Sequence, residues 1–204
     1  MIHKTGTIPS ELGLLTLCSS LGVAHNLLTG TIPNEVAAIS PMEPNQQGEY
    51  MGQYIRYNDN QLTGTLAPDF FRNNQSLMLH ASFENNQFSG SLPSEIGYWT
   101  GLSYFTIHNN ILTGPIPSEI GTFQSLGTLS LGANNWSGTF HSELGLLVTN
   151  GTINTFNISR SQTLTGTLPE EFCDWISDVS LDRVLAFDCG PVCDCDCNCS
   201  ETNA

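Results

Sequence analysis

Histidines and acids in the middle of the chain are the residues best suited to chemistry. His80, Glu84 and His108 stand at related places in a repeated pattern, and an imidazole–carboxylate set could act in hydrolysis or bind a metal ion. Such chemistry needs a pocket that excludes water and donors that stabilise developing charge. The short strands expected here form a shallow, open sheet without either. We therefore expect a non-catalytic protein without a cofactor or a metal.

Seven cysteines are unevenly distributed. Cys18 occupies an inward apolar position, so we expect a small buried residue. The other six are an even number that fits three disulfides and predicts a cross-linked C-terminal cap. Two alternatives stay open: a reduced tail, or a metal cluster of thiols alternating with Asp194 and Asp196, although Cys-x-Cys is not the spacing of structural zinc sites. The six are Cys173, Cys189, Cys193, Cys195, Cys197 and Cys199.

Five Asn-x-Ser/Thr sequons are candidate N-glycosylation sites and favour a secreted context. A glycan on Asn157 would face the predicted sheet and block one end of it, so this sequon is the least expected to be occupied. The sequons are at Asn74, Asn135, Asn150, Asn157 and Asn198.

A repeated unit must position all of these residues. Its clearest copy is 110–121 (NILTGPIPSEIG), and weaker copies begin at other asparagines along the chain. The repeat glycines are 24 residues apart in three of six intervals. A period of this length indicates a solenoid, because one unit cannot bury its own apolar face. We expect amide side chains of the repeat asparagines to bond the neighbouring coil, at Asn26, Asn60, Asn86, Asn110 and Asn134.

Each unit predicts a short strand, a turn, a second extended segment and a helical turn. Apolar residues stand three, five and eight positions before the repeat asparagine, as Ile107, Phe105 and Leu102 do, and this alternation is typical of a half-buried strand. The Leu-Thr-Gly-x-Ile-Pro segment then points aliphatic side chains inward and hydroxyls outward. We expect a serine such as Ser118 to cap the helical turn and a glycine such as Gly121 to end it.

These residues resemble the plant-type leucine-rich repeat, L-x-x-L-x-L-x-x-N-x-L-[TS]-G-x-[IL]-P-x-x-[LI]-G. The match runs from about Thr5 to Pro169, with Trp136 replacing the leucine after the asparagine. The resemblance implies an α/β solenoid, a right-handed superhelix curved like a horseshoe, with a parallel concave β-sheet, short second β-segments and convex helical turns. The Phe-Asp-Cys-Gly junction at 187–190 resembles the end of leucine-rich repeat proteins found in diatoms.

Departures from the repeat predict irregular coils and a division of the chain into a solenoid and a C-terminal cap. An insertion of about ten residues predicts a polar convex loop at 39–49, and two extra residues lie around 72–75. The sixth unit has Ser161 in place of its asparagine. We expect residues 1–172 to form about six to seven repeats without an N-terminal cap, as in a fragment of a longer protein, and 173–204 to form a cysteine-rich cap and acidic tail.

The predicted concave face carries a candidate binding site. Its residues stand one, two, four and six positions before each repeat asparagine. Adjacent strands are about 4.8 Å apart, so Tyr54, His80 and Tyr104 would form one continuous column. Aromatic residues and arginine are enriched at interface hot spots. The alternative is an ordinary solvated strand surface. The candidate ligand-binding residues are Tyr54, Arg56, Asp59, His80, Glu84, Tyr104 and His108.

Charge argues against several functions. The chain has 19 acidic and 5 basic residues, a formal net charge of −14 and no basic patch. Nucleic acids and anionic membrane surfaces both require clustered lysine and arginine. No apolar run of 18 residues is present, so we expect no transmembrane span.

The resemblance implies a recognition module, the ectodomain or part of one from a receptor-like or secreted protein, in an extracellular or cell-surface location. Relatives of this repeat type bind peptides, proteins or co-receptors and are often tethered to a membrane segment or kinase. We therefore expect a protein, peptide or glycan ligand, with a co-receptor as a further candidate partner. Two alternatives stay open: a structural wall or matrix protein, and an ice-binding protein whose hydroxyls, such as Thr29 and Thr31, form two parallel files about 4.8 Å in repeat.

Overall fold

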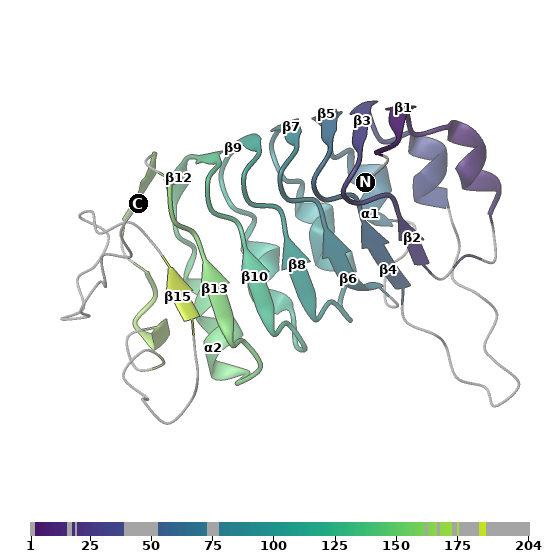
Figure 1. The fold of residues 1–204 in the computed structure, drawn as a ribbon. Coiled ribbons are helices and arrows are strands. Elements are labelled where there is room, and N and C mark those ends of the chain that lie inside the picture. Colours follow the sequence, from purple (N-terminus) through teal and green to yellow (C-terminus); the bar gives the residue numbers. More distant parts are fainter. Residues whose placement is uncertain are drawn as a thin grey trace, which may run out of the picture.

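The computed structural model describes residues 3–15, 18, 20–38, 53–72, 78–161, 163–166, 168–172, 175 and 184–186. The predicted polar loop at 39–49 and all six cysteines of the predicted cap lie outside these residues. The described part of the chain is a stack of coils that advances in one direction from the N-terminal end (Figure 1).

A seven-stranded parallel sheet covers one side of the stack, in the order β15-β13-β10-β8-β6-β4-β2 (Figure 1). Each coil supplies one strand to this sheet, where the predicted apolar alternation lies. Its strands are β2 (Ser20–Gly22), β4 (Gln53–Arg56), β6 (Met78–Ser82), β8 (Tyr104–Thr106), β10 (Thr128–Ser130), β13 (Thr155–Asn157) and β15 (Val184–Ala186).

A second parallel sheet runs along the upper edge of the stack in Figure 1, in the order β1-β3-β5-β7-β9-β11. Its strands are β1 (Thr5–Thr7), β3 (Leu27–Gly30), β5 (Gln61–Thr65), β7 (Gln87–Gly90), β9 (Ile111–Gly114) and β11 (Asn135–Trp136). A two-stranded sheet pairs β12 (Gly138–Thr139) with β14 (Leu164–Thr165).

Short helical turns cover the side of the stack opposite the seven-stranded sheet (Figure 1). They are η1 (Ser10–Leu14), η2 (Asn34–Ala38), α1 (Pro68–Arg72), η3 (Ser94–Tyr98), η4 (Ser118–Thr122), η5 (Ser142–Leu144) and α2 (Gly145–Thr149). Among the described residues, none of the helices has the length and apolar character needed to cross a membrane.

The apolar core lies between the sheets and the helical turns, as the alternation predicts. Phe105 and Ile107 are fully buried, and Phe156 of the irregular sixth coil is buried as well. Trp136 replaces the expected leucine without leaving its polar atom unpaired, because its indole nitrogen donates a hydrogen bond to the carbonyl of Leu131 at 2.7 Å. In the first coil, by contrast, Cys18 is only half-buried and packs against the edge of the core.

The repeat asparagines join neighbouring coils, as expected. The Asn110 amide donates to the carbonyls of Ile107 (3.0 Å) and Phe83 (3.1 Å), and its carbonyl oxygen accepts from the Phe88 N–H at 2.9 Å. These partners belong to its own coil and to the preceding one. Unpaired buried backbone groups are costly, so one asparagine per coil stabilises both the turn and the stack.

Two predictions about the helical turns are wrong. Ser118 does not cap η4: Pro117 precedes it as the N-cap, with no side-chain cap, and the Ser118 hydroxyl instead faces Glu119. Gly121 lies inside η4 rather than after it. A Cβ on Gly121 would lie 2.0 Å from the carbonyl oxygen of Glu143 on the next coil. Glycine is needed here because adjacent helical turns approach closely, not because the helix ends.

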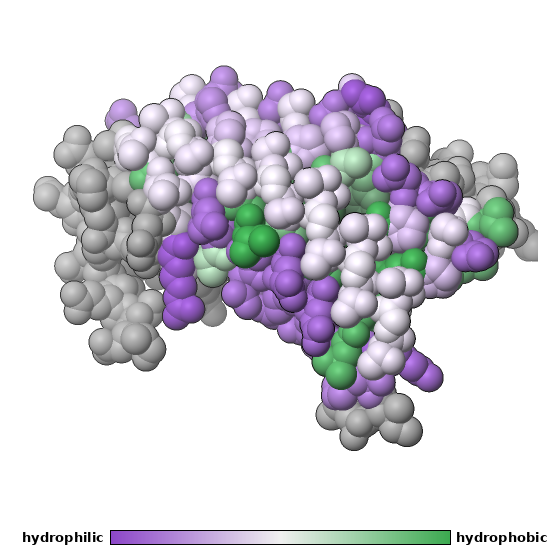
Figure 2. All heavy atoms as spheres, turned by 90° about the horizontal axis from the view of Figure 1, so that it is seen from above, coloured by the Kyte–Doolittle hydropathy of each residue, from purple (hydrophilic) through white to green (hydrophobic). Residues whose placement is uncertain are grey.

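The expected hydroxyl files are also wrong. Neighbouring strands of the six-stranded sheet are offset, so that Thr7 rather than Thr5 lies beside Thr29, and Gln61 follows on the other side of Thr29. Because the offset recurs, each lateral row changes from hydroxyl to amide or aliphatic side chain. Figure 2 looks down on this edge and shows a mostly pale and purple surface with small green patches.

One pattern in the helical turns was not anticipated. An acidic residue follows each repeat glycine by five positions, and six of these acids lie in the first turns of η1, η2, α1, η3, η4 and η5. Arg72 is placed between two of these carboxylates, at 3.0 Å from Asp69 and 2.6 Å from Glu95. The acidic row, as we call it, consists of Glu11, Glu35, Asp69, Glu95, Glu119, Glu143 and Glu171.

Candidate functional site

The candidate site is the outward side of the seven-stranded sheet, here called the sheet face. Strand pairing aligns Tyr54 with His80 and His80 with Tyr104 on adjacent strands. The three residues that sequence spacing placed in a column are therefore neighbours. Tyr54 is 38% exposed, whereas His80 and Tyr104 are half-buried.

The rings of this aromatic column pack against one another. The His80 and Tyr104 rings are stacked at 4.2 Å with an interplanar angle of 4°, and the Tyr54 and His80 rings lie 6.1 Å apart with a tilt of 36°. Because the stacked rings turn their faces toward each other, their edges and polar atoms are what remains for a ligand. The column therefore offers hydrogen-bonding edges, and the ring faces shared by His80 and Tyr104 are closed to a ligand.

His80 is held in its neutral form. Burial lowers its pKa, and the positive charge of Arg56 on the neighbouring strand lowers it further. The Nε2 atom lies 2.9 Å from the Ser82 hydroxyl, which fixes the ring orientation. Arg56 itself is exposed beside Tyr54. At neutral pH the column thus carries one fixed positive charge at Arg56 and an uncharged imidazole.

A row of small hydroxyl residues lies beneath the longer side chains. Ser82, Thr106 and Ser130, which sequence spacing placed on the surface, are only 4%, 2% and 6% exposed. The reason is that longer neighbours cover them. The Thr106 hydroxyl donates to Glu84, and the Ser130 hydroxyl lies 3.1 Å from Nδ1 of His108. These residues therefore support Glu84 and His108 instead of meeting a ligand.

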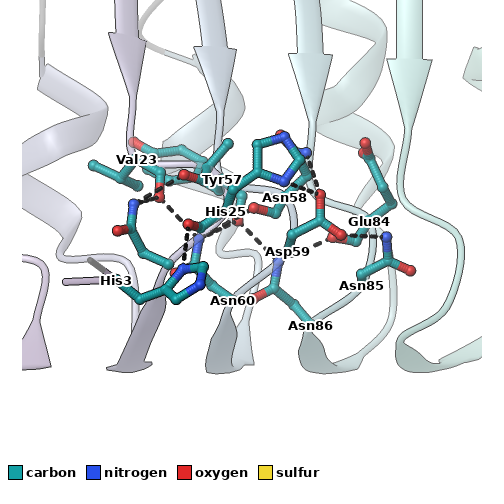
Figure 3. A network of polar contacts seen from close by, with 12 residues as sticks. His3, Val23, His25, Tyr57, Asn58, Asp59, Asn60, Glu84, Asn85 and Asn86 are labelled. Atoms are coloured by element: carbon teal, nitrogen blue, oxygen red, sulfur yellow. Dashed lines mark hydrogen bonds and ion pairs between the residues drawn. The ribbon is translucent and has the colours of Figure 1, made fainter. Parts of the chain in front are cut away.

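A second row forms where the strands turn, and Figure 3 shows His25, Asp59 and Asn85 of it from close by. Nδ1 of His25 lies 2.9 Å from one carboxylate oxygen of Asp59, and the Asn85 amide donates to the other at 2.7 Å. The amide of Asn109 continues the chain by donating to Asn85 at 2.8 Å. Asp59, a predicted ligand-binding residue, thus joins three further residues that were not among the seven candidates.

All four residues of this turn row share an unusual backbone. Their φ angles are 56° for His25, 55° for Asp59, 57° for Asn85 and 54° for Asn109. Histidine, aspartate and asparagine are enriched in this left-handed region. Their recurrence directly before the repeat asparagine was therefore a readable signal for both the turn and the row.

The long polar side chains of the sheet face end at β10. Gly132 and Ala133 stand where earlier coils have longer polar residues. A Cβ on Gly132 would lie 2.6 Å from the Ser159 carbonyl and 2.8 Å from the Asn157 side-chain oxygen. The sixth coil thus fills this space, and the candidate binding residues concentrate on β4, β6 and β8.

Some of the predicted glycosylation sites lie within the described residues, and the others lie outside them. Asn135 and Asn150 are exposed and Asn157 is half-buried. Asn74 and Asn198 lie outside the described part of the chain, like the cap cysteines. Within the described part, no three His, Cys, Asp or Glu side chains are arranged to hold a metal ion.

Comparison with known proteins gives the class. No protein-family model and no curated protein sequence matches the chain. Solved structures do match, among them the plant peptide hormone receptor RGFR1 in complex with RGF2, with a TM-score of 0.73, 25% identity and 85% of this chain covered. Together with the stacked coils, these likenesses make the chain a leucine-rich repeat protein.

Two further matches are receptor kinases from Arabidopsis. The leucine-rich repeat ectodomain of the receptor kinase GASSHO1/SCHENGEN3, in complex with CASPARIAN STRIP INTEGRITY FACTOR 2, has a TM-score of 0.70 at 26% identity over 91% of this chain. The receptor kinase HAESA, in complex with the peptide hormone IDA and the co-receptor SERK1, has a TM-score of 0.71 at 23% identity over 90%. The chain spans 25%, 22% and 28% of the RGFR1, GASSHO1/SCHENGEN3 and HAESA chains.

Proposed function

We propose that the chain is an extracellular, non-catalytic recognition module that binds a peptide or protein on its sheet face. The observation that carries this proposal is the aromatic column of Tyr54, His80 and Tyr104 beside Arg56 and Glu84. Likeness to RGFR1, a plant peptide hormone receptor, supports the same class of partner. The extracellular location and the division at residue 172 into solenoid and cap remain parts of this proposal.

The geometry favours a peptide or protein over a glycan. Sugar recognition by aromatic residues uses open ring faces, and here His80 and Tyr104 cover each other's faces at 4.2 Å. What remains outward is a series of polar edges flanked by a guanidinium and a carboxylate. Such edges suit the hydrogen-bonding groups of a polypeptide, which repeat along an extended chain.

The site is also preorganised. Ser82 holds His80, Thr106 holds Glu84 and Ser130 faces His108, so the outer side chains are fixed before a ligand arrives. Fixing a side chain on binding costs roughly 0.5–1.5 kcal/mol when it is otherwise free. Hydroxyl support from beneath reduces that cost, which is what a binding surface requires.

Alanine substitution on the sheet face tests the proposal. A displayed library of random peptides and a glycan array serve as probes, and selected peptides are measured against Tyr54→Ala, Glu84→Ala and Tyr104→Ala. We expect each substitution to weaken binding about 10-fold or more, as truncation of an interface anchor does. Tyr98→Ala is the matched control, because Tyr98 is 46% exposed on η3, on the side opposite the sheet face.

Two results would contradict the proposal. Peptide binding that survives all three substitutions together would move the site away from the sheet face. If the probes select glycans and no peptide, the proposal of a polypeptide ligand is contradicted.

A further inference from the structure

The three described sequons differ in what their asparagine side chains do. A glycan is attached to the side-chain nitrogen of asparagine and needs space around it. The structure shows Asn135 and Asn150 exposed and Asn157 half-buried. The three therefore separate into two surface positions and one position in the seven-stranded sheet.

Asn135 lies on β11, at one end of the six-stranded sheet. The central residue of its sequon, Trp136, is fully buried, so the two outer residues stand on the opposite, outward side of the short strand. The backbone is held by pairing with β9 and by the hydrogen bond from Ser137 to Gly114 at 2.8 Å. Asn135 is thus a fixed point on a surface away from the sheet face.

Asn150 directly follows α2, and its N–H donates to the Leu146 carbonyl at 3.0 Å. Its sequon continues through Gly151, whose φ of 72° turns the chain away from the helix. A Cβ placed on Gly151 would meet nothing within 4 Å. The surroundings of this sequon are therefore open.

Asn157, on β13, has a different role. Its side-chain oxygen accepts hydrogen bonds from the Ser159 N–H at 3.0 Å and the Ser159 hydroxyl at 2.9 Å. Gly132, just after the neighbouring strand β10, leaves room for it, since a Cβ there would lie 2.8 Å from that oxygen. The hydroxyl that completes the sequon is therefore engaged in holding the turn after β13.

We propose that Asn135 and Asn150 carry N-glycans, whereas Asn157 is a structural asparagine that remains unmodified. This inference rests on the proposed function only in requiring passage through a secretory pathway. Glycans at both positions would cover the C-terminal part of the six-stranded sheet and the end of α2. They would leave Tyr54, His80 and Tyr104 uncovered, so the described glycans and the proposed ligand occupy different surfaces.

Site mapping of the full chain, secreted from a eukaryotic host, tests this assignment. Enzymatic release in heavy-oxygen water converts each glycosylated asparagine to labelled aspartate, which mass spectrometry locates. We expect label at Asn135 and Asn150 and none at Asn157. Asn135→Gln and Asn150→Gln should each remove one glycan without changing the melting temperature. Asn157→Gln should remove none and lower the melting temperature by about 2–4 °C, because the local hydrogen bonds are lost.

A labelled Asn157 would overturn the inference, and so would an unlabelled Asn135 or Asn150. An unchanged melting temperature for Asn157→Gln would remove the structural role that sets this sequon apart. The peptide-binding assay on enzymatically deglycosylated protein separates the two proposals. If the deglycosylated protein still binds peptide but the glycan map differs from the expected one, only the glycan assignment is rejected. If the alanine variants lose peptide binding and the glycan map is as expected, both proposals are supported.

Discussion

His80 combines three constraints on one imidazole. Tyr104 stacks on its ring, Ser82 holds one of its nitrogens, and Arg56 opposes its positive charge. Each constraint comes from a different strand or from the same strand two residues away. The residue is therefore fixed both in orientation and in charge.

This arrangement predicts a dependence of stability on pH. The pKa of His80 is lowered in the folded protein, so near and below its ordinary value of about 6.5 the unfolded chain binds more protons than the folded one. Stability contributed by the neutral ring is present above that pH and is lost as the pH falls through it. Acidification from pH 7.5 to 5.5 should destabilise the native protein more than it destabilises His80→Gln, as measured by thermal unfolding.

His3→Gln provides the control, because His3 is exposed at the first coil. It should lose stability on acidification as the native protein does. Identical pH profiles for the native protein and His80→Gln would contradict the role assigned to His80.

The candidate site was only partly predictable at this scale. Constant spacing from the repeat asparagine correctly aligned Tyr54, His80 and Tyr104, because a period-two strand has one outward set of positions. The burial of Ser82 and Thr106 could not be predicted from spacing, because it depends on which longer neighbouring side chain covers them. Whether the predicted residues bind a ligand stays a prediction.

The helical turns show how a coil is limited by its neighbour. Gly121 in η4 faces the backbone of Glu143 at the beginning of η5, and an added methyl group would overlap that carbonyl. The same contact recurs one coil earlier, where a Cβ on Gly97 would lie 2.8 Å from the Cβ of Glu119. Coil spacing on this side is thus set by glycine.

Gly121→Ala should therefore destabilise the solenoid strongly. Overpacking typically costs about 1–3 kcal/mol, and the upper end applies here because the overlap is with backbone. Gly127→Ala is the matched control, since its nearest neighbour would be 3.5 Å away, an ordinary contact. Denaturant unfolding measures both variants. Equal free energies of unfolding for the two would show that η4 and η5 can move apart freely.

The elements were more predictable than their mutual placement. The alternation around Phe105 and the repeat asparagines correctly predicted strands, core and stacking, because these patterns have few physical solutions. The role of Gly121 was misread, since one sequence shows a glycine near a helix but not the coil that presses on it. The offset that places Thr7 rather than Thr5 beside Thr29 depends on inter-coil packing in the same way.

The whole molecule is stabilised by contacts between consecutive coils. Each strand and helical turn packs mainly on its counterpart in the next coil. In such a one-dimensional stack, opening begins at the ends and propagates. Amide hydrogen exchange should therefore be slowest in β6, β8 and β10 and faster toward β2. Uniform protection across these strands, measured by mass spectrometry, would instead indicate a single cooperative unit.

The acidic row has an electrical consequence for the molecule. Within the described part of the chain, seven carboxylates follow the helical turns with Arg72 among them, whereas the sheet face carries Asp59, Glu84 and Arg56. Among these described residues, acids are more numerous on the helical side. The result is a charge asymmetry across the thickness of the stack, whose field extends about 8 Å into physiological salt. A negatively charged surface would turn the helical side away from itself, and the protein would approach it with the sheet face leading.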